Sequence, residues 1–212
     1  AHKVISKAEG NIINLNDVTP SDNAFFYAKK LNKDPRKVEI ILSESKRVVR
    51  HFRHERQNEG VMICEHRLGF ISANAAVDES NVSGDENVIT LPKNPDISAH
   101  RLRQALEHKF NTQIGVLVTD TFGRPWRVGQ VNVAIGISGV PSTLPEKGGY
   151  DAYGRPLSVT EPAFCDEIAA ASGLVTKKAA KTPVVIFRGL NWRVTNSKAK
   201  DILRLTKEDM FL

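Results

Sequence analysis

Two acidic side chains, Asp78 and Asp120, are the residues best placed for chemistry, because each follows an apolar run. Asp78 lies in the segment SANAAVDESNV, and Asp120 comes directly after VLVT and before Thr121, which adds a hydroxyl and a main-chain carbonyl. Mg²⁺ in proteins is usually bound by one or two carboxylates together with substrate phosphates. The two carboxylates are therefore candidate ligands of one hard cation, although an Asp after a strand more commonly caps a turn or a helix.

Basic side chains near these positions are candidates to neutralise an anionic substrate. Arg124 and Arg127 flank a Pro-Trp pair in the turn after Asp120, and an Arg guanidinium binds a carboxylate or a phosphate through two parallel hydrogen bonds. Lys7, which follows VIS, is a further candidate for a phosphate. The competing interpretations are arginines stacked on Trp126 and a solvated turn lysine.

Several common kinds of site are missing from the sequence. It contains neither GxxxxGK[ST] nor a GxGxxG between a strand and a helix, so it predicts neither a P-loop nor a Rossmann site. The histidines are scattered, and His51 and His54 are expected to share a helix face without a carboxylate or cysteine that completes a ligand set. Cys64 and Cys165 are predicted to be reduced, buried thiols.

The elements that must position these residues mix helices with strands. Residues 4–6 are typical of the end of a strand. Helices are expected after the cap Ser21, after Asp34-Pro35, and from the cap Asp96 to about Asn111.

The remaining apolar segments predict mainly antiparallel strands. The segment GVMICEHRLGFISANAAV is typical of a hairpin, and the further elements expected are strands at NVITLP, 116–121, 131–138 and 183–187 and a short helix at 166–174. Gly123 and Pro125 are expected to end the strand that carries Asp120. Because helices and strands do not alternate regularly, an α+β fold is favoured over a doubly wound one.

The composition is that of a globular protein with a positive charge. The 212 residues are 41% hydrophobic and 25% charged, with a formal net charge of +6, a balance that suits anionic ligands such as nucleotides. The densest basic run, residues 46–56, is interleaved with valine and phenylalanine as in an amphipathic segment, so nucleic-acid binding is the weaker interpretation. No apolar stretch reaches the roughly 18 residues of a membrane span, and the cytoplasm is the default expectation.

Blocks of this sequence resemble, in order, the coenzyme F420 gamma-glutamyl ligases. These blocks are VISKAEG, ANAAVDESNV, LPKNPDISAHRLR, VTDTFGRPWRVGQVNVAIG, YGRPLSVT, DEIAAASGLV and PVVIFRGL. The resemblance covers most of residues 3–190, and the ANAxxDxSN and TDTFGRPWRxGQ blocks are too long for chance agreement. It implies an α+β gamma-glutamyl ligase fold over residues 1–212, with two intertwined subdomains and assembly as a homodimer.

The resemblance also implies site residues and cofactors. Asp78, Asp120 and Thr121 match the family's metal-binding positions, and Lys7 and Asn81 match nucleotide contacts. The implied cofactors are GTP as co-substrate and Mg²⁺ or Mn²⁺, with a monovalent cation as a further candidate.

Some features depart from the family pattern. His2 and Lys3 stand where the family usually has a polar pair that touches the nucleotide, and the residue types here differ from that pair. The loop before PVV, normally Gly-rich in archaeal members, is residues 176–182, in which Lys177 and Lys178 are candidates to face phosphates. The family's usual N-terminal segment is expected to be missing, through truncation or a differently built guanosine pocket, and so is the nitroreductase-like domain of some bacterial relatives.

The activity implied by the resemblance is GTP-dependent addition of L-glutamate to coenzyme F420-0, or a close deazaflavin variant, through a gamma-linked amide bond. Amide formation from a carboxylate is uphill in water, so the carboxylate would first attack the γ-phosphate of GTP, giving an acyl phosphate that the glutamate amine captures. Arg124 and Arg127 would counter the charge of this transfer. The alternative is a non-catalytic relative that keeps a nucleotide- or deazaflavin-binding groove.

Overall fold

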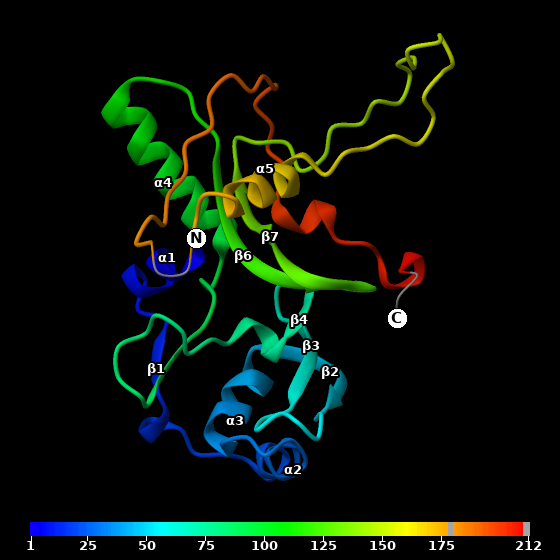
Figure 1. Ribbon diagram of the computed structural model, residues 1–212. Coiled ribbons are helices and arrows are strands. Elements are labelled where there is room, and N and C mark those ends of the chain that lie inside the picture. Colours follow the sequence, from blue (N-terminus) through cyan, green and yellow to red (C-terminus); the bar gives the residue numbers. More distant parts are fainter. Residues whose placement is uncertain (178–179, 210–212) are drawn as a thin grey trace. The chain divides into compact units, whose positions relative to one another are not determined.

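The computed structural model describes residues 1–177 and 180–209, and the chain divides into two compact units (Figure 1). One unit consists of residues 2–93, and the other of residue 1 with residues 94–212. Each combines helices with antiparallel strands, which confirms the expected α+β mixture. Within the described ranges, no helix is both long enough and apolar enough to cross a bilayer.

The unit of residues 2–93 contains a three-stranded sheet in the order β2-β3-β4 and a separate pair, β1-β5, all antiparallel. Its elements are α1 His2–Ala8, β1 Ile12–Asn14, η1 Leu15–Asp17, α2 Asp22–Leu31, α3 Pro35–Ser43, β2 Ser45–Phe52, β3 Val61–His66, β4 Ile71–Ala73, η2 Asn74–Ala76 and β5 Asn87–Ile89.

Local capping explains where α2 and α3 begin. The Ser21 hydroxyl accepts a hydrogen bond from the Ala24 amide at 3.3 Å, and the Asp34 carboxylate accepts one from the Arg36 amide at 2.8 Å, with Pro35 in the first turn. Both caps were predicted from the sequence and are confirmed. The apolar faces of the two helices and of β3 form one core, which contains Ala24, Ala28, Leu31, Val38, Ile41, Met62, Cys64 and Ala75.

The second unit is built on a long antiparallel hairpin of two strands. Its described elements are α4 Pro95–Phe110, β6 Val116–Arg124, β7 Arg127–Ser138, α5 Phe164–Gly173, η3 Ala199–Ile202 and η4 Thr206–Glu208. Helix α5 packs on the hairpin through Cys165 and Ala169, which contact Ala134 and Ile137. Gly136 lets the N-terminus of α4 approach β7, because a Cβ there would lie 2.4 Å from the main chain of Pro95.

Two segments have a different secondary structure from the one predicted. Residues 4–6 belong to helix α1 and not to a strand; the buried residues His2 and Ser6 are four positions apart, which is the helical spacing. His51 lies in strand β2 and His54 follows its end, so the two do not share a helix face. Main-chain pairing of β2 with β3, interrupted by two register shifts, overrides the helix-like spacing of this basic run.

Three further details correct the sequence-based picture. Asn94, not Asp96, caps α4, since its side chain accepts from the Ile97 amide at 3.1 Å. Strand β6 continues past Gly123 to Arg124 because β7 pairs with it along this length. Residues 183–187 contain no strand: the segment is apolar, but no neighbouring strand pairs with it in the part of the chain that the structure describes.

Candidate functional site

Helix α1 directs two lysines at the loop that follows β4 and η2. Lys3 and Lys7 are four residues apart and therefore lie on one face of the helix. The Lys3 ammonium donates to Asp78 Oδ2 at 2.5 Å, to the Ser80 hydroxyl at 2.6 Å and to the Ser80 carbonyl at 3.1 Å. The Lys7 ammonium donates to the Asn81 carbonyl at 2.5 Å. The structure thus brings together Lys7, Asp78 and Asn81, three of the predicted site residues.

A left-handed turn sets the position of this loop. Asn74, Ala75 and Ala76 have φ values of 50°, 47° and 56°, a conformation that L-residues other than glycine adopt at a cost. The Asn74 side chain accepts from the Met62 amide at 3.1 Å, which attaches the turn to β3. Asp78 then pairs with Ile89 through both main-chain hydrogen bonds, at 3.1 and 2.8 Å.

The Asp78 carboxylate is held ionised by its neighbours. Burial alone would raise the pKa of Asp78, but the hydrogen bonds from Lys3 and from the Ser80 amide outweigh it and bring the pKa below its ordinary value. Asp78 Oδ1 accepts from the Ser80 amide at 2.6 Å, and Oδ2 accepts from Lys3 and from the Ser80 hydroxyl. The site therefore presents a carboxylate that is negative at neutral pH.

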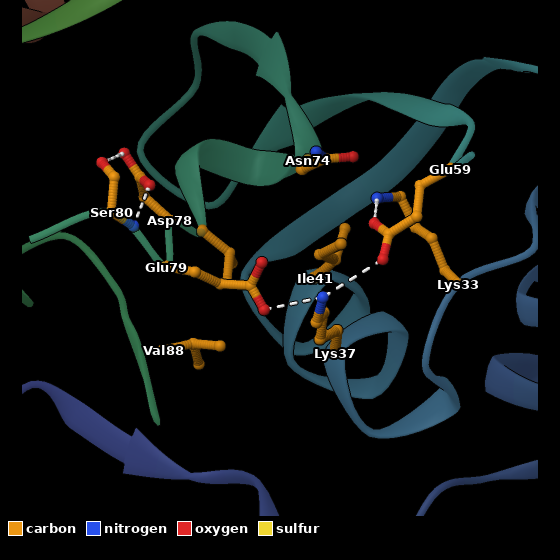
Figure 2. A pocket seen from close by; sticks show the side chains of 10 residues that line it. Lys33, Lys37, Ile41, Glu59, Asn74, Asp78, Glu79, Ser80 and Val88 are labelled. Carbon is orange, nitrogen blue, oxygen red and sulfur yellow. Dashed lines mark hydrogen bonds and ion pairs between the residues drawn. The ribbon is translucent and has the colours of Figure 1, made fainter. Parts of the chain in front are cut away.

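A cavity of about 440 Å³ adjoins this loop, and Figure 2 shows the side chains that line it. Alternating charges run along it: Glu79 pairs with Lys37 at 2.7 Å, Lys37 with Glu59 at 3.2 Å, and Glu59 with Lys33 at 2.7 Å. In the view of Figure 2, Asp78 and Ser80 point away from this chain of ion pairs. The lysines of the cavity are thus already compensated by carboxylates.

In the other unit, Asp120 and Thr121 are consecutive residues of β6, opposite Val133 and Asn132 of β7. Successive side chains of a strand point to opposite faces, so the Asp120 carboxylate and the Thr121 hydroxyl project from different sides of the hairpin.

The Thr121 hydroxyl belongs to a hydrogen-bonded chain that reaches α5. It donates to Asn132 Oδ1 at 2.8 Å, the Asn132 amide nitrogen donates to the Ser172 hydroxyl at 3.3 Å, and that hydroxyl donates to the Ala169 carbonyl at 2.6 Å. Because Ser172 has one proton and gives it to Ala169, it must accept from Asn132, which fixes the orientation of the amide. This chain ties β6, β7 and α5 together.

The remaining predicted residues of this unit lie on its surface. Arg124 and Arg127 are paired across the hairpin turn and are both exposed, and between them Trp126 has a φ of 62° and is 87% exposed. Lys177 is exposed shortly after α5. Lys178, predicted to face phosphates, lies outside the described residues.

The two cysteines were predicted to be reduced, buried thiols, and the structure describes both in that state. Cys64 and Cys165 are buried free thiols, and burial raises the pKa of Cys165 to about 12. Within residues 1–177 and 180–209, no three His, Cys, Asp or Glu side chains form a potential ligand cluster.

Sequence reasoning put Lys7 in a turn after a strand, whereas Lys7 lies in helix α1, and it missed the contacts of Lys3 and Ser80. The spacing of Lys3 and Lys7 would have indicated that both lysines lie on one face, but only if residues 2–8 had been predicted as a helix.

The predicted site residues fall into two groups. Lys7, Asp78 and Asn81 belong to one unit, whereas Asp120, Thr121, Arg124, Arg127 and Lys177 belong to the other.

The region of this chain that matches a known protein family contains both groups of residues. The family model described as F420-0:Gamma-glutamyl ligase matches residues 1–189. A coenzyme F420:L-glutamate ligase of Methanopyrus kandleri is 44% identical over 216 residues, covering 100% of this chain and 83% of that protein. The enzyme of the same name from Methanocaldococcus jannaschii is 40% identical over 212 residues, covering 100% and 82%. This chain therefore belongs to the F420-0:gamma-glutamyl ligase family.

Proposed function

We propose that this protein is a coenzyme F420:L-glutamate ligase that uses GTP to join L-glutamate to coenzyme F420-0, or to a close deazaflavin variant. The observation that carries the proposal is the family match over residues 1–189, which includes both groups of predicted site residues. The names of the relatives from Methanopyrus kandleri and Methanocaldococcus jannaschii support the ligase activity. GTP as the source of energy is our own extension from the sequence resemblance.

The residues present fit a divalent cation, Mg²⁺ or Mn²⁺. The Asp78 loop contributes only hard oxygen atoms, from a carboxylate, a hydroxyl and main-chain carbonyls, and three of these oxygens already surround the positive charge of Lys3. In the other unit, Asp120 and the main-chain carbonyl of Thr121 are candidate oxygen ligands of the same chemical kind. When bound, the cation would neutralise charge on the phosphates of GTP.

The protein side chains would mainly position charged groups. Lys7, with Asn81, would hold the nucleotide, and the lysines after α5 would face its phosphates. Arg124 and Arg127 carry permanent positive charge at an exposed hairpin turn, where they would counter the negative charge of phosphoryl transfer to the substrate carboxylate. The glutamate amine would then displace phosphate from the resulting acyl phosphate and form the gamma-linked amide.

The family's fold and assembly are part of the same proposal. The two compact units would be the two subdomains of a gamma-glutamyl ligase fold, and two chains would intertwine as a homodimer. Sedimentation equilibrium should then give twice the chain mass of 23.5 kDa.

The substitution Asp120→Asn tests whether Asp120 takes part in the proposed ligase activity. It removes one negative charge and keeps the shape of the side chain, and we expect kcat/KM for glutamate-dependent GDP release to fall by about 100-fold or more. The control is Glu208→Gln, which makes the same change of carboxylate to amide outside the residues that the family model matches. Full activity in Asp120→Asn would remove Asp120 from the site. GTP binding without any GDP release by the wild-type protein would instead favour a non-catalytic relative.

A further inference from the structure

The Lys3 ammonium is bound in the way that a small cation would be. It makes three contacts, all to oxygen: Asp78 Oδ2 at 2.5 Å, the Ser80 hydroxyl at 2.6 Å and the Ser80 carbonyl at 3.1 Å. An ammonium group has three protons, so each is accounted for. The Lys3 side chain is 20% exposed and that of Asp78 is 36% exposed, so water screens this pair only in part.

These contacts use the atoms that a divalent cation would need. Mg²⁺ and Mn²⁺ bind hard oxygen ligands, and Asp78 Oδ2 together with the two Ser80 oxygens is such a set. The other carboxylate oxygen, Oδ1, accepts from the Ser80 amide at 2.6 Å. A metal ion that approaches Asp78 therefore meets a carboxylate whose charge is already neutralised by a lysine on the same unit.

Lys7 provides an internal comparison. It lies one helical turn further along α1, and its ammonium contacts the Asn81 main-chain carbonyl at 2.5 Å. That contact neutralises no carboxylate. The two lysines are thus the same residue type on the same helix face, but only Lys3 occupies a position that a metal ligated by Asp78 would contest.

We propose that Lys3 is a tethered cation that competes with divalent metal for Asp78. This inference rests on the proposed role of Asp78 as a metal ligand. In the absence of nucleotide, the lysine holds the carboxylate and metal binds there weakly. A triphosphate provides an alternative anionic partner for the displaced ammonium, so metal and nucleotide bind better together than separately, as linkage requires.

Mn²⁺ titrations without nucleotide test this competition, with free Mn²⁺ measured by electron paramagnetic resonance. Lys3→Met keeps the aliphatic stem and removes the charge, and we expect its Mn²⁺ affinity to be about tenfold or more above that of the wild type. Lys3→Arg keeps a cation beside Asp78 and should bind Mn²⁺ no more tightly than the wild type. Lys7→Met is the matched control and should leave Mn²⁺ affinity unchanged.

The double variant Lys3→Met with Asp78→Asn locates the effect. If the gain arises at Asp78, the second substitution should abolish it. Circular dichroism of each variant shows whether it is folded. If Lys3→Met does not fold, Lys3→Arg provides the test, and a Mn²⁺ affinity above that of the wild type in Lys3→Arg would contradict the proposal.

Equal Mn²⁺ affinity in the wild type and Lys3→Met would overturn the proposal, and so would a gain that survives Asp78→Asn. These titrations contain no GTP, glutamate or deazaflavin. Failure of the proposed ligase activity would therefore appear in the assay of GDP release and not in this comparison.

Discussion

The loop around Asp78 and the β6-β7 hairpin carry the two halves of the predicted site in different ways. The loop is half-buried and fastened from within its own unit, by Lys3 and Lys7 and by main-chain pairing with β5. The hairpin turn, residues 124–127, instead leaves its arginines exposed. Contacts within its own unit hold the first region in place, whereas the arginines of the second are exposed to solvent. Changes in the loop should therefore affect stability, and changes at the hairpin turn should affect function alone.

The largest expected difference in stability is between Asp78→Ala and Arg127→Ala. Removing the carboxylate leaves a mostly buried ammonium at Lys3 without its counter-charge, so we expect the free energy of unfolding to fall by about 2 kcal/mol. Arg127 is exposed at the hairpin turn, and its removal should change the free energy of unfolding by less than about 0.5 kcal/mol. Urea denaturation measures both. Equal effects would show that the loop is no more tightly organised than the hairpin turn.

The contribution of Asp78 should also depend on pH in a defined direction. Because its pKa in the folded protein is lowered, its stabilising effect is present above the unfolded pKa of about 4 and is lost as the pH falls through the lower folded value. The stability gap between the wild type and Asp78→Asn should therefore be full near pH 6 and should shrink as the pH falls below about 4. Urea midpoints across this range measure the gap, and a constant gap would contradict the assigned ion pair.

The smallest effect concerns the left-handed turn before Asp78. Ala76 has a φ of 56°, and glycine relieves such strain but gains freedom in the unfolded chain, so Ala76→Gly should be neutral or stabilising by up to about 0.5 kcal/mol. Ala73, three residues earlier, has an ordinary φ of −69°, and Ala73→Gly should destabilise by about 0.5–1 kcal/mol. Thermal unfolding of the pair tests this, and equal losses would argue against strain in the turn.

Local signals predicted the elements that depend on neighbouring residues. Ser21 and Asp34 begin helices because their side chains bond to amides two or three residues ahead. The hairpin of β3 and β4 was predicted from its apolar pattern, which is also a local signal. The resemblance to the family predicted Asp78 and Asp120 as metal ligands without knowledge of the fold, and this assignment stays a prediction.

Elements that depend on distant residues could not be predicted in this way. Residues 45–52 form a strand because β3 is available to pair with them, although their spacing suits a helix. Residues 183–187 are apolar but form no strand. The contact between Lys3 and Asp78 joins residues 75 positions apart, and no local pattern reveals such a pair.

The most direct test of the central claim is mass spectrometry of the deazaflavin product. The wild-type protein, incubated with coenzyme F420-0, L-glutamate, Mn²⁺ and GTP, should yield a deazaflavin heavier by one or more glutamyl residues, with release of GDP. The same mixture without GTP should leave the deazaflavin unchanged. An unmodified deazaflavin in the complete mixture, from protein shown to be folded, would contradict the proposed ligase activity.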